Sequence, residues 1–434
     1  MQKQNPKYKQ EIPFPGLLFM QTMQDSGLLN EVTMAMCLDV LSDPNGMKVM
    51  GEYSDDLAFP LLLSQLSKKP FKNPPPEVDG LLKFAIADNK QIVGINPEEC
   101  HVLIAGQTGT GKSTLLKILF SQALLLRKKQ DIKEQIVNWL FVKAQDMREL
   151  LKISPDILVV PFDEIKLNPL EPVQGMKETE WASVFADLWI QAFRLYEGSK
   201  GFLIECLNSL YSKNKESGQY PNLFDLFYYV KSLQFPAVSR NSRYQESILN
   251  RLGSLIYGSL SPVFKCSRGH ISNLINTHAV FEILYLTSEQ QVFIVNYLLS
   301  FLFYHKIFHD KGLRHFVGVD DANLIFDRSF EQRPDLGLPI IHHLLTTVRK
   351  NKINLFVCSQ TPHQLGASIH SNAFAKIIFS LSNGHDLEFM FRSMGIKNEE
   401  QKAYCYKLAP REMVVKFSTR YQDPFTAVVP EVQL

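Results

Sequence analysis

Eight consecutive residues have the types and spacing of a phosphate-binding loop. Residues 106–113 read GQTGTGKS, which matches the pattern G-x-x-x-x-G-K-[ST]. The apolar run 102–105 precedes the loop, and an apolar helical pattern begins at Leu115. A strand, a glycine-rich loop and a helix form the context in which this pattern is meaningful. The alternative is a glycine-rich turn with an accidental Lys-Ser pair, and the four fixed positions with the correct flanks count against it.

The chemistry of phosphate binding explains these residue types. Glycines let the backbone curl tightly, so that several N–H groups point at the phosphate oxygens. A helix beginning near Lys112 adds its unpaired N–H groups and the positive end of its dipole. We expect Lys112 to reach the β and γ oxygens and the Ser113 hydroxyl to hold Mg²⁺. The predicted binding set is Gly106, Gln107, Thr108, Gly109, Thr110, Gly111, Lys112, Ser113 and Thr114. The chain is therefore predicted to bind a nucleoside triphosphate.

Two acids follow another apolar run. Asp320 and Asp321 come directly after residues 315–319, HFVGV. An acid at the carboxyl end of a strand beside the phosphate-binding loop holds Mg²⁺ through water, and Asp320 takes that role. Asp321 is placed to orient or deprotonate an attacking water. Two aspartates after an apolar run can also form a solvated strand end, but the upstream loop favours the catalytic interpretation.

Two further candidates lie around the apolar run 354–360, NLFVCSQ. Gln360 ends this predicted strand, where it could contact the γ-phosphate or the water. The alternative for Gln360 is a cap before the turn at Thr361. A helix is predicted over 342–352, and Arg349 lies in its last turn, where a cation suits the negative end of the helix dipole. Alternatively, Arg349 is an arginine finger that reaches the γ-phosphate of a neighbouring subunit.

The scaffold for these residues is predicted to be an α/β fold. Apolar strand-like runs alternate with helical patterns, which is typical of a parallel, doubly wound sheet. The predicted strands after the hairpin at 82–95 are 136–143, 157–160, 279–286, 315–320 and 354–360. Residues from about 177 to 260 are almost wholly helical and are predicted to form an insertion.

The chain is predicted to have two parts. Residues 1–72 carry helical patterns, and the triple proline at 74–76 forms a stiff extended link. We therefore expect a small helical N-terminal region at 1–76 and a nucleotide domain at 77–434.

Composition limits the cellular compartment and the kinds of surface expected for this protein. The 434 residues carry a net charge of +2, which excludes a global basic surface for nucleic acid. Six scattered cysteines without metal-ligand spacing indicate reduced thiols, and the N-terminus lacks the apolar core of a signal peptide. The longest apolar run, 292–304, is shorter than the roughly 20 residues that span a bilayer. We expect a cytoplasmic protein without direct membrane insertion.

Three motifs together resemble the FtsK/HerA superfamily of ATPases, within the RecA-like class of P-loop NTPases. They are GQTGTGKS at 106–113, VGVDDANLIF at 317–326 and TTVRKNKINLFVCSQTPHQL at 346–365. The likeness covers roughly residues 80–434 and is strongest to HerA-type and to conjugative or secretion-type motor ATPases.

The resemblance implies a homohexameric ring that binds ATP and Mg²⁺ at subunit interfaces and moves double-stranded DNA through a central pore. It assigns Lys112 and Ser113 to Walker A and Asp320 to magnesium. Asp321 becomes the catalytic acid, Arg349 the trans-acting arginine and Gln360 the sensor. One departure is that the family usually has Glu at the position of Asp321, a carboxylate one methylene longer. A second is that the N-terminus shows neither the β-barrel of HerA proteins nor the membrane helices of FtsK and conjugative coupling proteins.

The resulting prediction is an ATP-hydrolysing ring motor that translocates DNA in transfer, processing or defence. One alternative is a motor that moves protein substrates in secretion. Another is an ATP-binding switch or scaffold with slow hydrolysis that regulates a partner effector such as a nuclease. The short acid at Asp321 favours this interpretation slightly, and the presence of Lys112, Asp320, Arg349 and Gln360 disfavours it. A GTPase is disfavoured because no N-K-x-D guanine motif follows the loop.

Overall fold

The computed structural model describes residues 69–99, 101–129, 135–143, 145–309, 312–332, 345 and 351–431. The chain separates into two compact units, Met1–Pro70 and Phe71–Leu434, and nearly all of the described residues belong to the second unit. The predicted helices of the N-terminal region, residues 1–68, lie outside the described residues. The link after them is extended at Pro75 and leads into a short 3₁₀ helix, η1 (Pro76–Val78).

One eleven-stranded sheet organises this unit, with the order β2-β1-β11-β10-β9-β3-β8-β7-β4-β6-β5. The strands are β1 (Leu82–Ala87), β2 (Ile92–Ile95), β3 (Val102–Ala105), β4 (Ile136–Val142), β5 (Leu158–Pro161), β6 (Ala279–Glu282), β7 (Arg314–Val319), β8 (Ile353–Ser359), β9 (Ala375–Ile378), β10 (Glu412–Phe417) and β11 (Phe425–Val428). The strands from β9 to β5 in this order pair in parallel. The predicted parallel sheet is thus confirmed for this part.

The rest of the sheet is antiparallel, and of this part only the β1–β2 pair was predicted from the sequence, as the hairpin at 82–95. Strand β10 pairs antiparallel with β9 and β11, and β1 pairs antiparallel with β11 and β2. The sheet is therefore mixed rather than wholly parallel. The short connection between β10 and β11 allows adjacent antiparallel pairing, whereas parallel neighbours need a crossover.

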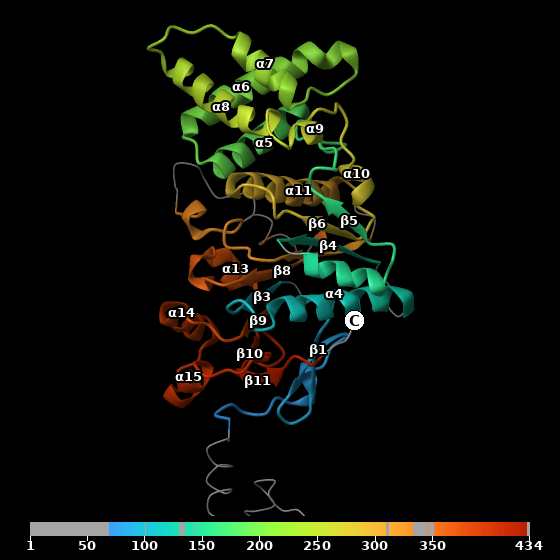
Figure 1. Cartoon of the computed structure of the whole chain (residues 1–434), viewed down its shortest axis with the longest axis vertical. Coiled ribbons are helices and arrows are strands. Elements are labelled where there is room, and N and C mark those ends of the chain that lie inside the picture. Colours follow the sequence, from blue (N-terminus) through green and yellow to red (C-terminus); the bar gives the residue numbers. More distant parts are fainter. Residues whose placement is uncertain are drawn as a thin grey trace, which may run out of the picture. The chain divides into compact units, whose positions relative to one another are not determined.

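Side chains of the central strands alternate between two cores, one on each face of the sheet. On β3, Val102 and Ile104 pack with helix α4 (Lys112–Lys129), whereas Leu103 and Ala105 join the core that holds helix α11 (Ser288–Phe308). This burial of both faces explains why the strand was an uninterrupted apolar run. Helices thus cover both faces of the sheet, as the predicted doubly wound fold requires (Figure 1).

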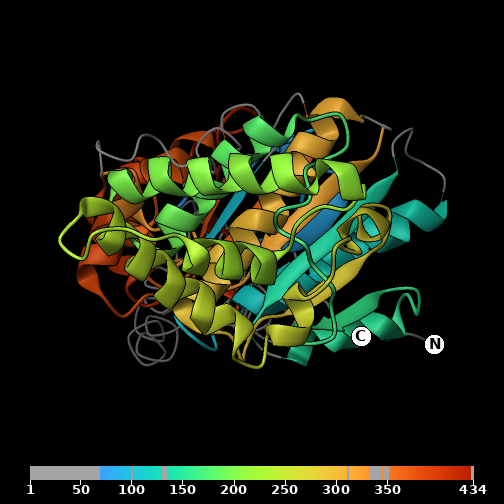
Figure 2. The same cartoon turned by 90° about the horizontal axis from the view of Figure 1, so that it is seen from above.

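Helices dominate the segment between β5 and β6, where the sequence predicted a helical insertion. They are α5 (Glu178–Phe193), α6 (Glu197–Asn214), α7 (Leu223–Ser232), α8 (Arg240–Ile256), α9 (Ser261–Phe264) and α10 (Ile271–Leu274). Trp181 of α5 lies edge-on to Tyr297 and Phe301 of α11, so α5 rests on α11. Figures 1 and 2 show these green and yellow helices gathered on that side of α11. Helix α10 contacts the sheet itself, because its Leu274 carbonyl accepts a hydrogen bond from Nε1 of Trp139 in β4 at 3.2 Å.

Helix α11 is long and apolar enough to cross a membrane by length and composition alone. In this fold, 78% of its apolar window is buried inside the protein, between the sheet and α5. The helix that contains residues 292–304 is therefore a core helix.

Smaller helices complete the described unit. The C-terminal α-helices are α13 (Ala367–Asn372), α14 (Gly384–Met394) and α15 (Glu399–Cys405). The 3₁₀ helices after η1 are η2 (Gln145–Lys152), η3 (Lys215–Ser217), η4 (Arg328–Phe330) and η6 (Pro362–Gln364). The segment that follows β4 is thus a 3₁₀ helix.

Candidate functional site

The glycine-rich loop joins β3 to α4 at the carboxyl edge of the parallel strands. Two backbone hydrogen bonds fix its start: Gly106 N–H donates to the Ser359 carbonyl at 3.0 Å, and Gln107 N–H donates to the Ser380 carbonyl at 2.9 Å. Ser359 ends β8 and Ser380 follows β9, so both neighbours of β3 hold the loop.

The glycines of the loop are required by its geometry. Gly109 and Gly111 have φ values of +81° and +118°, in the left-handed region that side chains disfavour. A Cβ at Gly106 would lie 2.7 Å from the Phe379 Cβ, which leaves no room for another residue. The loop therefore forms the tight curl that phosphate binding needs, at the N-terminus of an 18-residue helix.

Lys112 points into this curl. Its buried Nζ donates hydrogen bonds to the carbonyls of Gly106 at 2.6 Å and Gln107 at 2.8 Å. Burial lowers the pKa of Lys112, while the charges of Asp320 and Asp321 act in the opposite direction. The ammonium group is thus held at the centre of the loop within the field of Asp320, the predicted magnesium ligand, and Asp321, the predicted catalytic acid.

The two acids lie at the end of β7, and the strand order corrects one expectation. Strand β8, and not β7, is the direct neighbour of β3. The Asp320 N–H continues the ladder toward β4 by donating to the Phe141 carbonyl at 3.0 Å. Asp321 then turns the chain with φ of +53°, so successive carboxylates leave the strand in different directions. Strand β8 therefore separates the strand that carries the acids from β3, which carries the loop.

Lys143 contacts one of the predicted site residues, and this contact was not predicted from the sequence. It follows β4 directly, and its Nζ lies 2.7 Å from Oδ2 of Asp321. Both side chains are partly shielded, with exposed fractions of 26% and 31%. The position of Lys143 in the sequence could have identified it. Lys143 comes directly after the buried strand β4, just as Asp320 comes directly after the buried strand β7.

Gln360 lies beside the loop. Its Oε1 accepts a hydrogen bond from Thr108 Oγ1 at 3.2 Å. The neighbouring residues form a second connection, in which Asn323 binds the Ser359 hydroxyl through its carbonyl oxygen and donates from Nδ2 to Thr361 Oγ1 at 2.6 Å. The turn after β7 is thus tied to the end of β8, where the predicted sensor lies.

Arg349 and most of its predicted helix lie outside the described residues. Ser113 and Thr114 occupy the first turn of α4, with partly exposed side chains. The hydroxyl of Ser113 and the carboxylate of Asp320 supply the hard oxygen ligands that Mg²⁺ prefers. Together with the glycine curl and Lys112, these donors fit a magnesium-bound nucleotide.

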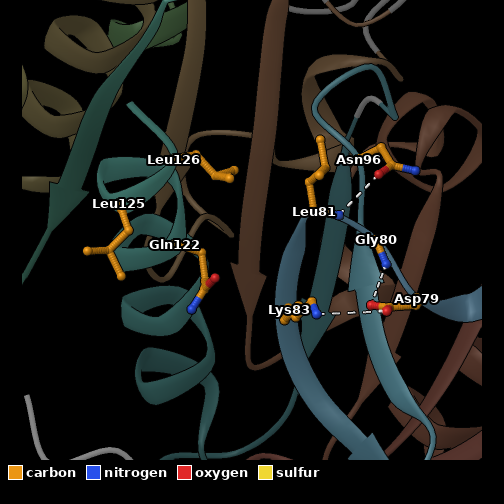
Figure 3. Close-up of a pocket in the computed structure, with 8 residues that line it drawn as sticks. All are labelled: Asp79, Gly80, Leu81, Lys83, Asn96, Gln122, Leu125 and Leu126. Atoms are coloured by element: carbon orange, nitrogen blue, oxygen red, sulfur yellow. Dashed lines mark hydrogen bonds and ion pairs between the residues drawn. The ribbon is translucent and has the colours of Figure 1, made fainter. Parts of the chain in front are cut away.

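A separate groove of about 600 Å³ lies between the β1–β2 hairpin and the C-terminal half of α4 (Figure 3). Its lining includes Leu81, Lys83 and Asn96 on one side and Gln122 and Leu125 on the other. None of the predicted site residues lines this groove, so it is distinct from the nucleotide loop.

Known proteins resemble this chain in one stretch of sequence and in fold. A model of the FtsK/SpoIIIE family matches residues 61–133. No match was found among curated proteins. The solved structure of VirB4 of Thermoanaerobacter pseudethanolicus is similar over 82% of this chain and 99% of that chain, at 13% identity and a TM-score of 0.60.

Two structures of a conjugation protein are similar as well. The bacterial conjugative coupling protein TrwBΔN70, in complex with sulphate, matches 85% of this chain and 97% of that chain at 14% identity, with a TM-score of 0.59. The plasmid coupling protein TrwB in complex with ADP and Mg²⁺ matches the same shares at 13% identity, with a TM-score of 0.58. These comparisons confirm the predicted RecA-like P-loop fold and the resemblance to the FtsK/HerA superfamily.

Proposed function

We propose that this chain, whose motifs and fold are those of a P-loop ATPase of the FtsK/HerA type, hydrolyses ATP to move DNA. The observation that supports the proposal best is the convergence of Lys112, Asp320, Asp321 and Gln360 at one edge of the sheet. These residues come from strand ends and a helix start, so the fold brings them together from distant parts of the chain. The setting we propose is DNA transfer, processing or defence in the cytoplasm.

Each residue has a distinct proposed task in hydrolysis. Lys112 would bind the β and γ oxygens, and Ser113 and Asp320 would hold the Mg²⁺. The bound ion would neutralise charge on the phosphate oxygens. Asp321 would orient the attacking water and accept its proton, which is the work of a positioned carboxylate. Gln360, already in contact with the loop through Thr108, would report the state of the γ-phosphate.

Movement of DNA is proposed from likeness and from local charge. The similar TrwB structures are described as those of a conjugative coupling protein. A net charge of +2 leaves any DNA contact to local basic groups such as those at 68–69, 127–129 and 349–352. In a hexamer, six copies of a weak group would add their phosphate contacts. Arg349 would then complete the site of the neighbouring subunit.

One observation favours a second function, an ATP-binding switch with slow hydrolysis. Asp321 is shorter than the usual Glu, and Lys143 already occupies one of its oxygens at 2.7 Å. A short carboxylate that is paired with a lysine is a poor base, so hydrolysis would be slow. Slow hydrolysis suits a protein that regulates a partner by nucleotide binding. A protein-secretion motor would use the same site and differ only in its substrate.

The steady-state ATPase rate, measured with and without double-stranded DNA, tests these proposals. The variants are Lys112→Ala, Asp321→Glu and Arg349→Ala, with Lys397→Ala as a control because its side chain is exposed. A DNA-stimulated rate that Lys112→Ala and Arg349→Ala abolish, and that falls steeply with salt, supports a ring motor on DNA. A background rate that rises only in Asp321→Glu supports the switch and contradicts the motor.

A further inference from the structure

Arg411 lies against the nucleotide loop on the side opposite the catalytic acids. Its backbone N–H donates to the Thr110 carbonyl at 2.9 Å. A Cβ built on Gly111 would lie 3.4 Å from both Cα and Cγ of Arg411, so the residue borders the last turn of the loop. This contact comes from the start of β10, in the antiparallel part of the sheet.

The position of Arg411 is fixed from several directions. Its backbone carbonyl accepts a hydrogen bond from Val429 N–H at 3.0 Å, and its φ of +66° turns the chain sharply at this point. The guanidinium Nη2 lies 2.7 Å from Oε1 of Glu431. The Arg411 side chain is 38% exposed, so part of it remains accessible beside the ion pair.

The direction of a bound triphosphate follows from the strand order. Thr108 contacts Gln360 at the end of β8, and the two acids follow β7, which is one strand further from β3. The γ-phosphate therefore lies on the side of the loop that faces β8 and β7. The nucleoside is attached to the other end of the triphosphate chain. It must therefore leave the loop toward Gly111, where Arg411 stands.

We infer that Arg411, held by Glu431, forms the nucleoside-binding wall of this site and stacks on the base. The inference rests on the proposed function, because it concerns the same nucleotide. A guanidinium is planar and stacks on aromatic faces, whereas a lysine ammonium does not. Stacking accepts every base, since each has a π-face, so Arg411 contributes affinity for the nucleoside rather than discrimination between bases.

Calorimetric titration with two ligands separates the nucleoside from the phosphates. The ligands are AMP-PNP and inorganic tripolyphosphate, each with Mg²⁺, and the variants are Arg411→Ala and Arg411→Lys. Both variants retain a Cβ and the backbone hydrogen bonds of Arg411. Arg243→Ala, which removes an exposed arginine from α8, is the matched control.

The expected result is a loss of AMP-PNP affinity of about 10-fold in Arg411→Ala, which is the size of one stacking contact. Tripolyphosphate affinity should change by less than about twofold, because the loop donors remain. Arg411→Lys should behave like Arg411→Ala, and Arg243→Ala like the wild type.

Two results would overturn the inference while leaving the proposed function intact. Equal losses for both ligands in Arg411→Ala would mean that Arg411 supports the loop or the phosphates, and unchanged AMP-PNP affinity would mean that it does not touch the nucleotide. A wild-type protein that binds neither ligand would refute the proposed function and this inference together.

Discussion

Gly318 links the strand that carries the catalytic acids to the helix that follows the nucleotide loop. A Cβ at Gly318 would lie 2.5 Å from Leu140 Cδ2 and 3.0 Å from Cζ of Phe120, which belongs to α4. Both neighbours are almost fully buried, so neither can move into solvent. We therefore predict that Gly318→Ala destabilises the protein and displaces α4 from β7.

The magnitude follows from two opposing terms. Overpacking of a buried site costs about 1–3 kcal/mol, whereas replacing glycine by alanine stabilises by about 0.4–1 kcal/mol through the unfolded chain. The expected net loss in the free energy of unfolding is about 1–2 kcal/mol. Gly201→Ala is the matched control, because Gly201 lies inside α6 and a Cβ there would meet nothing within 4 Å. This control should gain roughly 0.5–1 kcal/mol.

Urea unfolding followed by tryptophan fluorescence measures both changes, and calorimetric titration with AMP-PNP measures the effect on the site. Gly318→Ala should unfold at lower urea and bind AMP-PNP more weakly, while Gly201→Ala should unfold at higher urea with unchanged affinity. If both alanine variants were stabilised equally, the close packing of Gly318 against α4 would be wrong.

Three other predictions concern the site and its core. Lys143→Met should raise the basal ATPase rate about fivefold, because a partly exposed ion pair of about 1 kcal/mol no longer holds Asp321; a fivefold fall would show that Lys143 positions the acid instead. Asp321→Asn should lower the ATPase rate by about 10²–10⁴-fold with AMP-PNP affinity retained, and equal loss of both would contradict a role as base. Burial lowers the pKa of His315 to about 3, so only the unfolded chain takes up this proton as the pH falls below 6.5. Wild-type stability should therefore fall below pH 6.5 by up to about 1.4 kcal/mol per pH unit from this residue, and urea unfolding of His315→Gln should lack this slope.

Local pattern was sufficient to predict the elements that carry the site. The loop at 106–113, its flanking strand and its helix are adjacent in sequence, so their chemistry can be read without the fold. The buried strands β4, β7 and β8 were also evident as apolar runs, because both faces of each strand are covered. Strand β6 was predicted to reach residue 286, but it ends at Glu282, since an apolar run does not distinguish a strand from the turn that follows it, in which Leu284 and Tyr285 are exposed.

The missed features depend on long-range pairing. Lys143 and Asp321 are 178 residues apart, and only the order β8-β7-β4 makes them neighbours. Periodicity within a strand carries no information on that order. The same holds for Arg411, which reaches Thr110 because β10 returns antiparallel beside β9. Contacts of this kind become visible only when the sheet is assembled.

The contacts around Asp321 change the interpretation of its short side chain. The backbone on either side is fixed by hydrogen bonds from Asp320 N–H to Phe141 and from Ala322 N–H to Cys358, and Lys143 holds the carboxylate. The position of the acid is therefore set by β4 and β8 as well as by side-chain length. A glutamate at this position has a side chain one methylene longer, so Asp321→Glu changes the reach of the carboxylate and its pairing with Lys143. Asp321 and Lys143 are best regarded as one unit. Aspartate, rather than the longer glutamate, is the side chain whose length matches the lysine on the neighbouring strand.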